Sequence, residues 1–216
     1  MNTEPYPAPV LPLSDRDALG TLLPVELTCA LRQLDLSSGP EGLYALAESL
    51  RRPGEPRSFA AEWTRALEPA LRRRGCQPLT PNRRRCEQGE FQFLRQGEAG
   101  RLVVLRVSKI KVRRYGNAYR VDPHLDFDAR WQACRLGAHL KTAADCRRVF
   151  PHAFVLFLGF ADERHPFRRE LDELQAATSF GRWFLPAHET VWDDPHGRGF
   201  RTLAACWHLG ATEGQP

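Results

Sequence analysis

GEFQFLRQGEAGRLVVLRVSKIK, residues 89–111, is the stretch that decides the fold expected for this chain. Its first eight residues read as a strand that carries two phenylalanines on one face, because side chains alternate between the two faces of a strand. A turn from Gly97 to Gly100 leads into RLVVLRVSKIKV, residues 101–112, which reads as the returning strand. We therefore predict a β-hairpin.

Positive charge is concentrated in the second half of this stretch and just beyond it. Residues 101–120 contain seven basic side chains and no acidic one, whereas the whole chain has a formal net charge of +5. The segment begins apolar and then alternates basic residues with Ile110 and Val112. Clustered basic residues beside aromatic ones are typical of proteins that hold a phosphate backbone. The alternative is a solvated edge strand whose charges prevent pairing with other chains.

The composition is that of an ordered globular protein. With 216 residues and 42% hydrophobic content, the chain can bury one substantial core. No apolar run approaches the roughly 20 residues of a membrane span, and the N-terminus lacks the pattern of a secretory signal. We therefore expect a cytoplasmic protein that does not contact a membrane. The six cysteines form no CxxC pair, which favours reduced thiols.

The chain divides into three parts by composition. Residues 1–13 are rich in proline and predict a flexible arm, residues 14–75 predict a helical part, and residues 76–216 predict an α/β core. We expect the last two parts to form one compact unit. The helical part should contain a helix over 15–34 that is interrupted near Pro24, a second over 40–51, and a third that begins at Ser58 and stops at Gly75. Three arginines end the third helix, where they suit either the helix dipole or a nucleic acid.

The remainder of the core follows the hairpin. A helix is expected over residues 126–140, then a strand over 153–160 whose continuous apolar run, AFVLFLGF, indicates burial on both faces. A helix over 166–178 and a closing hairpin built from WFLPAHETVW and FRTLAACWHL complete the chain.

This order of helix, antiparallel hairpin, helix and apolar strand resembles the core of the PD-(D/E)xK nuclease-like superfamily. The resemblance covers about 23 residues of the hairpin and extends more loosely to Phe160. It implies a mixed α/β (α+β) fold with a nuclease-like core of hairpin, helix, buried strand and helix, preceded by N-terminal helices. In that family two carboxylates hold a divalent cation against the scissile phosphate, and a lysine near them orients or activates water.

The family's motif falls on specific residues of this chain. It implies that the helix acid is Glu62 or Glu68, that the first-strand acid is Glu90 or is replaced by Gln92, and that the E-x-K pair is replaced by Arg106 and Ser108. An arginine repels a cation, and a serine lacks the charge of lysine. Lys109 or Lys111 could take over only through a register shift that turns a side chain to the opposite face.

The leading hypothesis is therefore a nucleic-acid-binding protein, with DNA as the favoured ligand, an impaired metal site and no expected cofactor or metal. A first alternative is an active Mg²⁺- or Mn²⁺-dependent nuclease with Glu62, Glu68, Glu90 and Lys109 in its site, where Glu90 binds the metal. A second alternative is a protein-interaction or assembly subunit that binds a protein partner or forms a homodimer. The predicted nucleic-acid contacts are Arg101, Arg106, Ser108, Lys109, Lys111, Arg113, Arg114, Tyr115, Tyr119 and Arg120.

Overall fold

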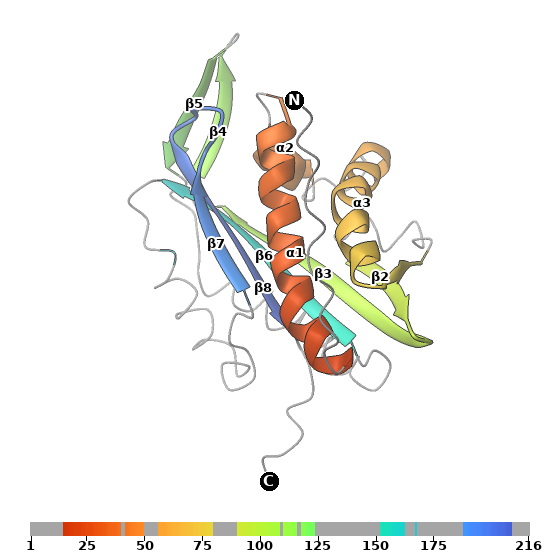
Figure 1. Ribbon diagram of the computed structural model, residues 1–216. Helices are drawn as coiled ribbons and strands as arrows, with labels where there is room; N and C mark the ends of the chain where they lie inside the picture. Colours follow the sequence, from red (N-terminus) through yellow and green to blue (C-terminus); the bar gives the residue numbers. More distant parts are fainter. Residues whose placement is uncertain are drawn as a thin grey trace, which may run out of the picture.

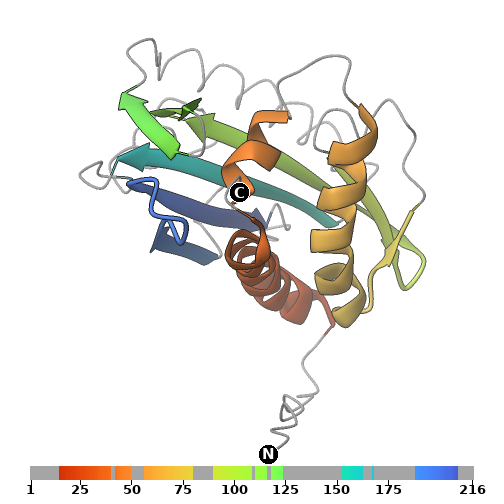
Figure 2. The ribbon, with the colours of Figure 1, turned by 90° about the horizontal axis from the view of Figure 1, so that it is seen from above.

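Three helices cover one face of a six-stranded sheet in this computed structural model (Figures 1 and 2). The structure describes residues 15–39, 42–49, 56–79, 90–108, 110–115, 118–123, 152–162, 167 and 188–208. Within these ranges the helices are α1 (Asp15–Ser37), α2 (Gly42–Ser49) and α3 (Pro56–Arg73). The strands are β1 (Gln77–Pro78), β2 (Glu90–Arg95), β3 (Glu98–Ser108), β4 (Ile110–Tyr115), β5 (Ala118–Pro123), β6 (His152–Asp162), β7 (His188–Asp193) and β8 (Phe200–His208).

The main sheet is mixed, with the strand order β1-β2-β3-β6-β8-β7. Strands β3 and β6 run parallel, and every other neighbouring pair in this sheet is antiparallel. The expected mixed α/β class is therefore confirmed. The closing hairpin is also confirmed, because β7 and β8 pair from His188 opposite Cys206 to Asp193 opposite Arg201.

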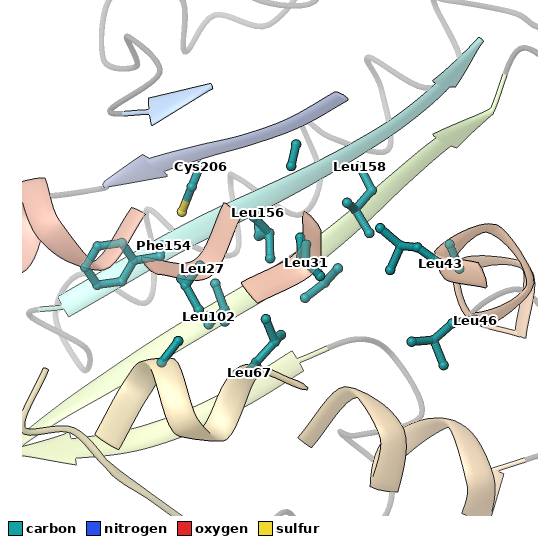
Figure 3. Close-up of a cluster of buried hydrophobic side chains, with 14 of the residues drawn as sticks. Leu27, Leu31, Leu43, Leu46, Leu67, Leu102, Phe154, Leu156, Leu158 and Cys206 are labelled. Atoms are coloured by element: carbon teal, nitrogen blue, oxygen red, sulfur yellow. The ribbon is translucent and has the colours of Figure 1, made fainter. Parts of the chain in front are cut away.

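The predicted buried strand is β6, which lies between β3 and β8 and is buried at every residue from His152 to Ala161. One of its faces packs against the helices. Figure 3 shows this contact, with leucines from all three helices facing the sheet. A leucine that is fully buried contributes about 1.5–3 kcal/mol, so this layer supplies much of the driving force for folding. The labelled residues are Leu27, Leu31, Leu43, Leu46, Leu67, Leu102, Phe154, Leu156, Leu158 and Cys206.

The predicted hairpin is present as β2 and β3, but its turn is shorter than expected. Arg95 pairs with Glu98, which leaves only Gln96 and Gly97 in the turn, with φ values of 50° and 81°. Two consecutive positive φ angles are typical of a type I′ turn, which matches the twist of the strands. Gly100 lies inside β3, where a Cβ atom would come within 2.1 Å of the Phe93 ring. This glycine therefore permits close packing and does not form the turn.

The predicted strand over residues 101–112 changes its pairing partner between Ser108 and Ile110, on the two sides of Lys109, which lies outside the described residues. Strand β3 ends at Ser108, the last residue that pairs with β6, and β4 begins at Ile110 and pairs with β5 in a separate two-stranded sheet. We call β4 and β5, residues 110–115 and 118–123, the basic ribbon. Figure 1 shows that the basic ribbon extends beyond the end of the main sheet. The basic half of the predicted strand thus leaves the layer in which both faces are buried.

Helix α1 differs from the expected helix because Pro24 does not interrupt it. A proline inside a helix costs about 3 kcal/mol, since it removes a hydrogen bond and crowds the preceding turn. Leu19, Leu23, Leu27 and Leu31 are each at most 1% exposed on the face of α1 that packs into the core. Four buried leucines outweigh that cost, at about 1.5–3 kcal/mol each.

The other two helices agree with the prediction in the residues that the structure describes, apart from the start of α3. Helix α2 covers Gly42–Ser49, inside the predicted range of 40–51, whose remaining residues lie outside the described ones, and α3 begins at Pro56, two residues before the predicted cap. Proline is favourable at the first helical position, where its missing N–H would have no partner. The predicted stop is confirmed: Gly75 has a φ of 71°, its N–H donates to the carbonyl of Arg72, and the N–H of Cys76 donates to the carbonyl of Leu71. These two bonds form a Schellman motif.

Several predicted elements lie outside the described residues. They are the arm over 1–13, the helix over 126–140, and all of the helix over 166–178 except Phe167, which is helical. Among the helices that are described, none is long and apolar enough to cross a membrane.

Candidate functional site

The basic ribbon concentrates charge on a small element. Among its described residues it carries four basic side chains and one acidic one. Arg113 pairs with Arg120 across the two strands, Arg114 pairs with Tyr119, and Lys111 pairs with the acidic Asp122. Tyr115 has 53% of its surface exposed, and Arg120 is also exposed. The predicted nucleic-acid contacts on the ribbon are Lys111, Arg113, Arg114, Tyr115, Tyr119 and Arg120.

The root of the ribbon, where β3 passes into β4, is buried and held by two hydroxyl groups. Ile110 is 1% exposed and belongs to the hydrophobic core, and Val112 packs against that core. The Ser108 hydroxyl donates to the Ile110 carbonyl at 2.5 Å and accepts from the Ile110 N–H at 3.4 Å. The Tyr44 hydroxyl donates to the same carbonyl at 3.1 Å and accepts from the Val112 N–H at 3.4 Å. Helix α2 and strand β3 therefore both fix the start of the ribbon.

Arg106 packs against the aromatic rings next to this root. It lies in register with Leu158 of β6 and on the same face as Val104, so its side chain enters the helix-covered side of the sheet. Its guanidinium carbon is 5.4 Å from the centre of the Tyr44 ring and 6.0 Å from that of Phe160. Burial lowers the pKa of Arg106 to about 10, which leaves it charged at neutral pH. The charge is thus used in cation–π contacts that help to hold the Tyr44 ring.

Three aromatic rings connect this root to the turn between β7 and β8. The Tyr44 ring lies 5.2 Å from Phe160 and 5.6 Å from Phe200, measured between ring centres. On the far side of these rings, the guanidinium carbon of Arg198 lies 4.8 Å from the centre of Phe200. Arg106 and Arg198 therefore flank one aromatic cluster.

Arg198 also belongs to a buried charge cluster that the sequence did not reveal. The cluster consists of Asp35, Asp194 and Arg198, whose side chains are each at most 2% exposed. Arg198 donates to both carboxylate oxygens of Asp194 and lies 3.8 Å from the Asp35 carboxylate. Asp35 in turn accepts from the N–H of Leu43 at 2.9 Å and from the Trp192 indole at 2.8 Å.

The cluster joins the end of α1, the start of α2 and the β7–β8 turn, and these donors and the arginine satisfy its two carboxylates. We interpret it as a structural clamp, because each charged group of the cluster is paired or hydrogen-bonded within the protein. Asp194 and Arg198 are four residues apart, but Asp35 is far from both in the sequence, and the Trp192 indole that also binds Asp35 is 157 positions away from it. Only the turn-like segment DDPHGRG gave a local signal.

The register of β2 and β3 bears on one acid of the alternative nuclease site, Glu90. Glu90 pairs with Val103, an odd-numbered position of β3, whereas Arg106 and Ser108 occupy even-numbered positions on the opposite face of the sheet. Glu68 forms an ion pair with Arg72 at 2.7 Å. The side chains of Glu62 and Glu90, and all of Lys109, lie outside the described residues.

A metal does not fit the positions that the resemblance assigns. Arg106 stands where the family has a carboxylate, and its cation would oppose a divalent ion. In the part of the chain that the structure describes, no group of three histidine, cysteine or acidic side chains could hold a metal ion. The side chains at the motif positions of β3 therefore suit a structural role and not the binding of a divalent cation.

Arg101 and the arginines at the end of α3, which the sequence analysis considered as contacts to nucleic acid, lie away from the ribbon. Arg101 is 8% exposed, pairs with Gln92, and lies seven residues before Ser108, roughly 23 Å along the strand. The arginines that end α3 have structural partners: Arg73 and Arg74 bind Glu26 at 2.8 and 2.6 Å. Glu26 is partly buried, which opposes its ionisation, but the two arginines outweigh this effect and hold its pKa below the usual value of 4.5.

Comparisons with protein-family models, with curated proteins and with solved structures find no match to this chain.

Proposed function

We propose that this protein binds nucleic acid through the basic ribbon, and that its work is binding. The observation that carries the proposal is the location of the charge: four of the predicted basic contacts lie on a two-stranded element that extends from the body of the molecule. Anionic backbones are attracted to such concentrated positive charge, and Lys and Arg neutralise their phosphates.

The root residues have a different role in this proposal. Arg106 and Ser108 hold the ribbon, and Arg101 lies too far along β3 to act with it. In this proposal, the resemblance to PD-(D/E)xK nucleases describes a fold in which Arg106 stands at the position of the metal-binding carboxylate. A cytoplasmic location belongs to the same proposal and suits the free thiols of Cys29, Cys76 and Cys206.

Fluorescence anisotropy with a labelled 20-base-pair DNA duplex tests the proposal. The ribbon variant replaces Lys111, Arg113, Arg114 and Arg120 with alanine. The matched control, the helix-layer variant, removes the same charge from exposed residues of α1 and α3, as R32A/R65A/R72A/R73A. We expect the ribbon variant to bind at least about tenfold more weakly at low salt than either the wild type or the helix-layer variant.

Circular dichroism verifies that both variants remain folded. Absence of binding by the wild-type protein at low salt would reject the proposal, and equal losses in the two variants would reject the ribbon as the site. Co-purification of a stoichiometric protein partner together with absence of nucleic-acid binding would favour the assembly subunit instead.

A further inference from the structure

We infer that the ligand of the basic ribbon is B-form double-stranded DNA, and that the ribbon enters its major groove. This inference rests on the proposed function and names its substrate class. Three features of the ribbon support it: its shape, the distribution of its charges over two faces, and the way in which its root is held.

The dimensions of the ribbon match the groove. Its strands have six paired residues each and a separation of about 4.8 Å; because Ile110 and Val112 pack into the body, the three pairs beyond Val112, roughly 10 Å long, form the part that can enter the groove. The major groove of B-form DNA is about 12 Å wide and 8.5 Å deep, and it accommodates a two-stranded ribbon with its side chains. The ribbon extends beyond the end of the main sheet, so its outer end is the part presented to a groove (Figure 1).

The register places basic residues on both faces of the ribbon. Lys111, Arg113, Arg120 and the acidic Asp122 hold register positions on one face, and Arg114 holds a position on the other. The face of Arg114 begins with Ile110 at the buried root, so on that face the charge lies toward the outer end. An element inside a groove lies between two phosphate backbones, so positive charge on both faces of the ribbon can neutralise phosphates on both sides. A surface that binds one strand needs charge on one side only.

The root favours a ligand of fixed shape. The Tyr44 hydroxyl bridges Ile110 and Val112, and the Ser108 hydroxyl binds Ile110 as well, so the ribbon is held before any ligand arrives. A pre-positioned element binds a regular duplex with little further loss of entropy.

Two other nucleic acids fit the ribbon less well. Single strands are usually bound in concave grooves with aromatic platforms, whereas this element projects outward. The A-form duplex of RNA has a deep, narrow major groove that side chains cannot read.

Competition experiments test the inference with three unlabelled ligands of one sequence: the DNA duplex, one of its strands, and the corresponding RNA duplex. Each displaces a labelled DNA duplex from the full-length protein. We expect the DNA duplex to compete at least about tenfold better than either alternative. Equal or better competition by the single strand or by the RNA duplex would overturn this inference and leave the proposed function standing.

A second measurement tests the groove. Bulky substituents on C5 of cytosine project into the major groove, and we expect them to weaken binding several-fold, whereas a drug that occupies the minor groove should leave it unchanged. The reverse pattern would overturn the assignment to the major groove. Absence of binding to all three nucleic acids would overturn both this inference and the proposed function, so the two failures are distinguishable.

Discussion

Replacing Tyr44 with phenylalanine tests whether a single hydroxyl holds the root of the basic ribbon. The substitution removes the bond that this hydroxyl donates to the Ile110 carbonyl at 3.1 Å and the one that it accepts from Val112 at 3.4 Å. It keeps the ring, and therefore keeps the contacts with Phe160 and with Arg106. The change consequently isolates the hydrogen bonds from the packing of the core.

The magnitude follows from the two bonds. The Ile110 carbonyl retains the Ser108 hydroxyl as a donor, so its loss is about 1 kcal/mol. The bond to Val112 is long, and leaving its N–H without this partner adds about 1 kcal/mol at most. We therefore expect Y44F to lower the free energy of unfolding by about 1–2 kcal/mol, which corresponds to roughly 2–8 °C in Tm for a chain of this size.

Urea denaturation and amide hydrogen exchange measure this effect. Tyr115→Phe is the control, because the Tyr115 side chain is mostly exposed and its substitution should change stability by less than about 0.5 kcal/mol. Exchange in β4 should become faster in Y44F while β6 remains protected, and affinity for duplex DNA should fall because the ribbon is less well positioned. Equal stability of the two variants, together with unchanged exchange in β4, would refute this account of the root.

Three further predictions concern the body of the molecule. Asp35→Asn should lower the free energy of unfolding by about 2–3 kcal/mol, because it weakens charged hydrogen bonds in a buried site. The control Asp193→Asn, which alters an exposed ion pair, should lower it by less than about 0.5 kcal/mol. Similar values for the two variants in urea denaturation would contradict the interpretation of the cluster as a structural clamp. Gly100→Ala should cost about 1–3 kcal/mol, because the added Cβ meets the Phe93 ring, and an unchanged urea midpoint would exclude this close contact. Glu26→Gln should destabilise the protein at neutral pH. Because the folded-state pKa of Glu26 is lowered, the stability that its carboxylate contributes is present above pH 4.5 and is lost as the pH falls below that value. A difference in Tm between wild type and variant that persists undiminished in acid would show that ionisation of Glu26 does not cause the difference.

Features with a local cause could be predicted from the sequence. The buried strand β6 follows from an unbroken apolar run, and the β2–β3 hairpin follows from two alternating segments around a glycine. Arg106 lies two residues beyond Val104 and shares its face, but the sequence interpretation assigned it to the nucleic-acid contacts. What the sequence does not reveal is that Tyr44 lies below that arginine.

Features that depend on contacts between distant residues could not be predicted. The alternation of side chains does not show that the pairing with β6 stops at Ser108, nor that the following Ile110 is bound by Tyr44, 66 residues away. Pro24 remains inside α1 because leucines that face the sheet stabilise the helix. The charge cluster around Asp35 likewise requires a tertiary structure to bring its members together.

The salt dependence of DNA binding tests the central claim most directly. Each phosphate that a basic residue neutralises contributes about 0.9 to the slope of log K against log salt concentration. If the four basic residues of the ribbon contact four phosphates, the ribbon variant should have a slope that is shallower than that of the wild type by roughly 3–4, while the helix-layer variant keeps the wild-type slope. Identical slopes for the wild type and the ribbon variant would contradict the claim that the basic ribbon binds the nucleic acid.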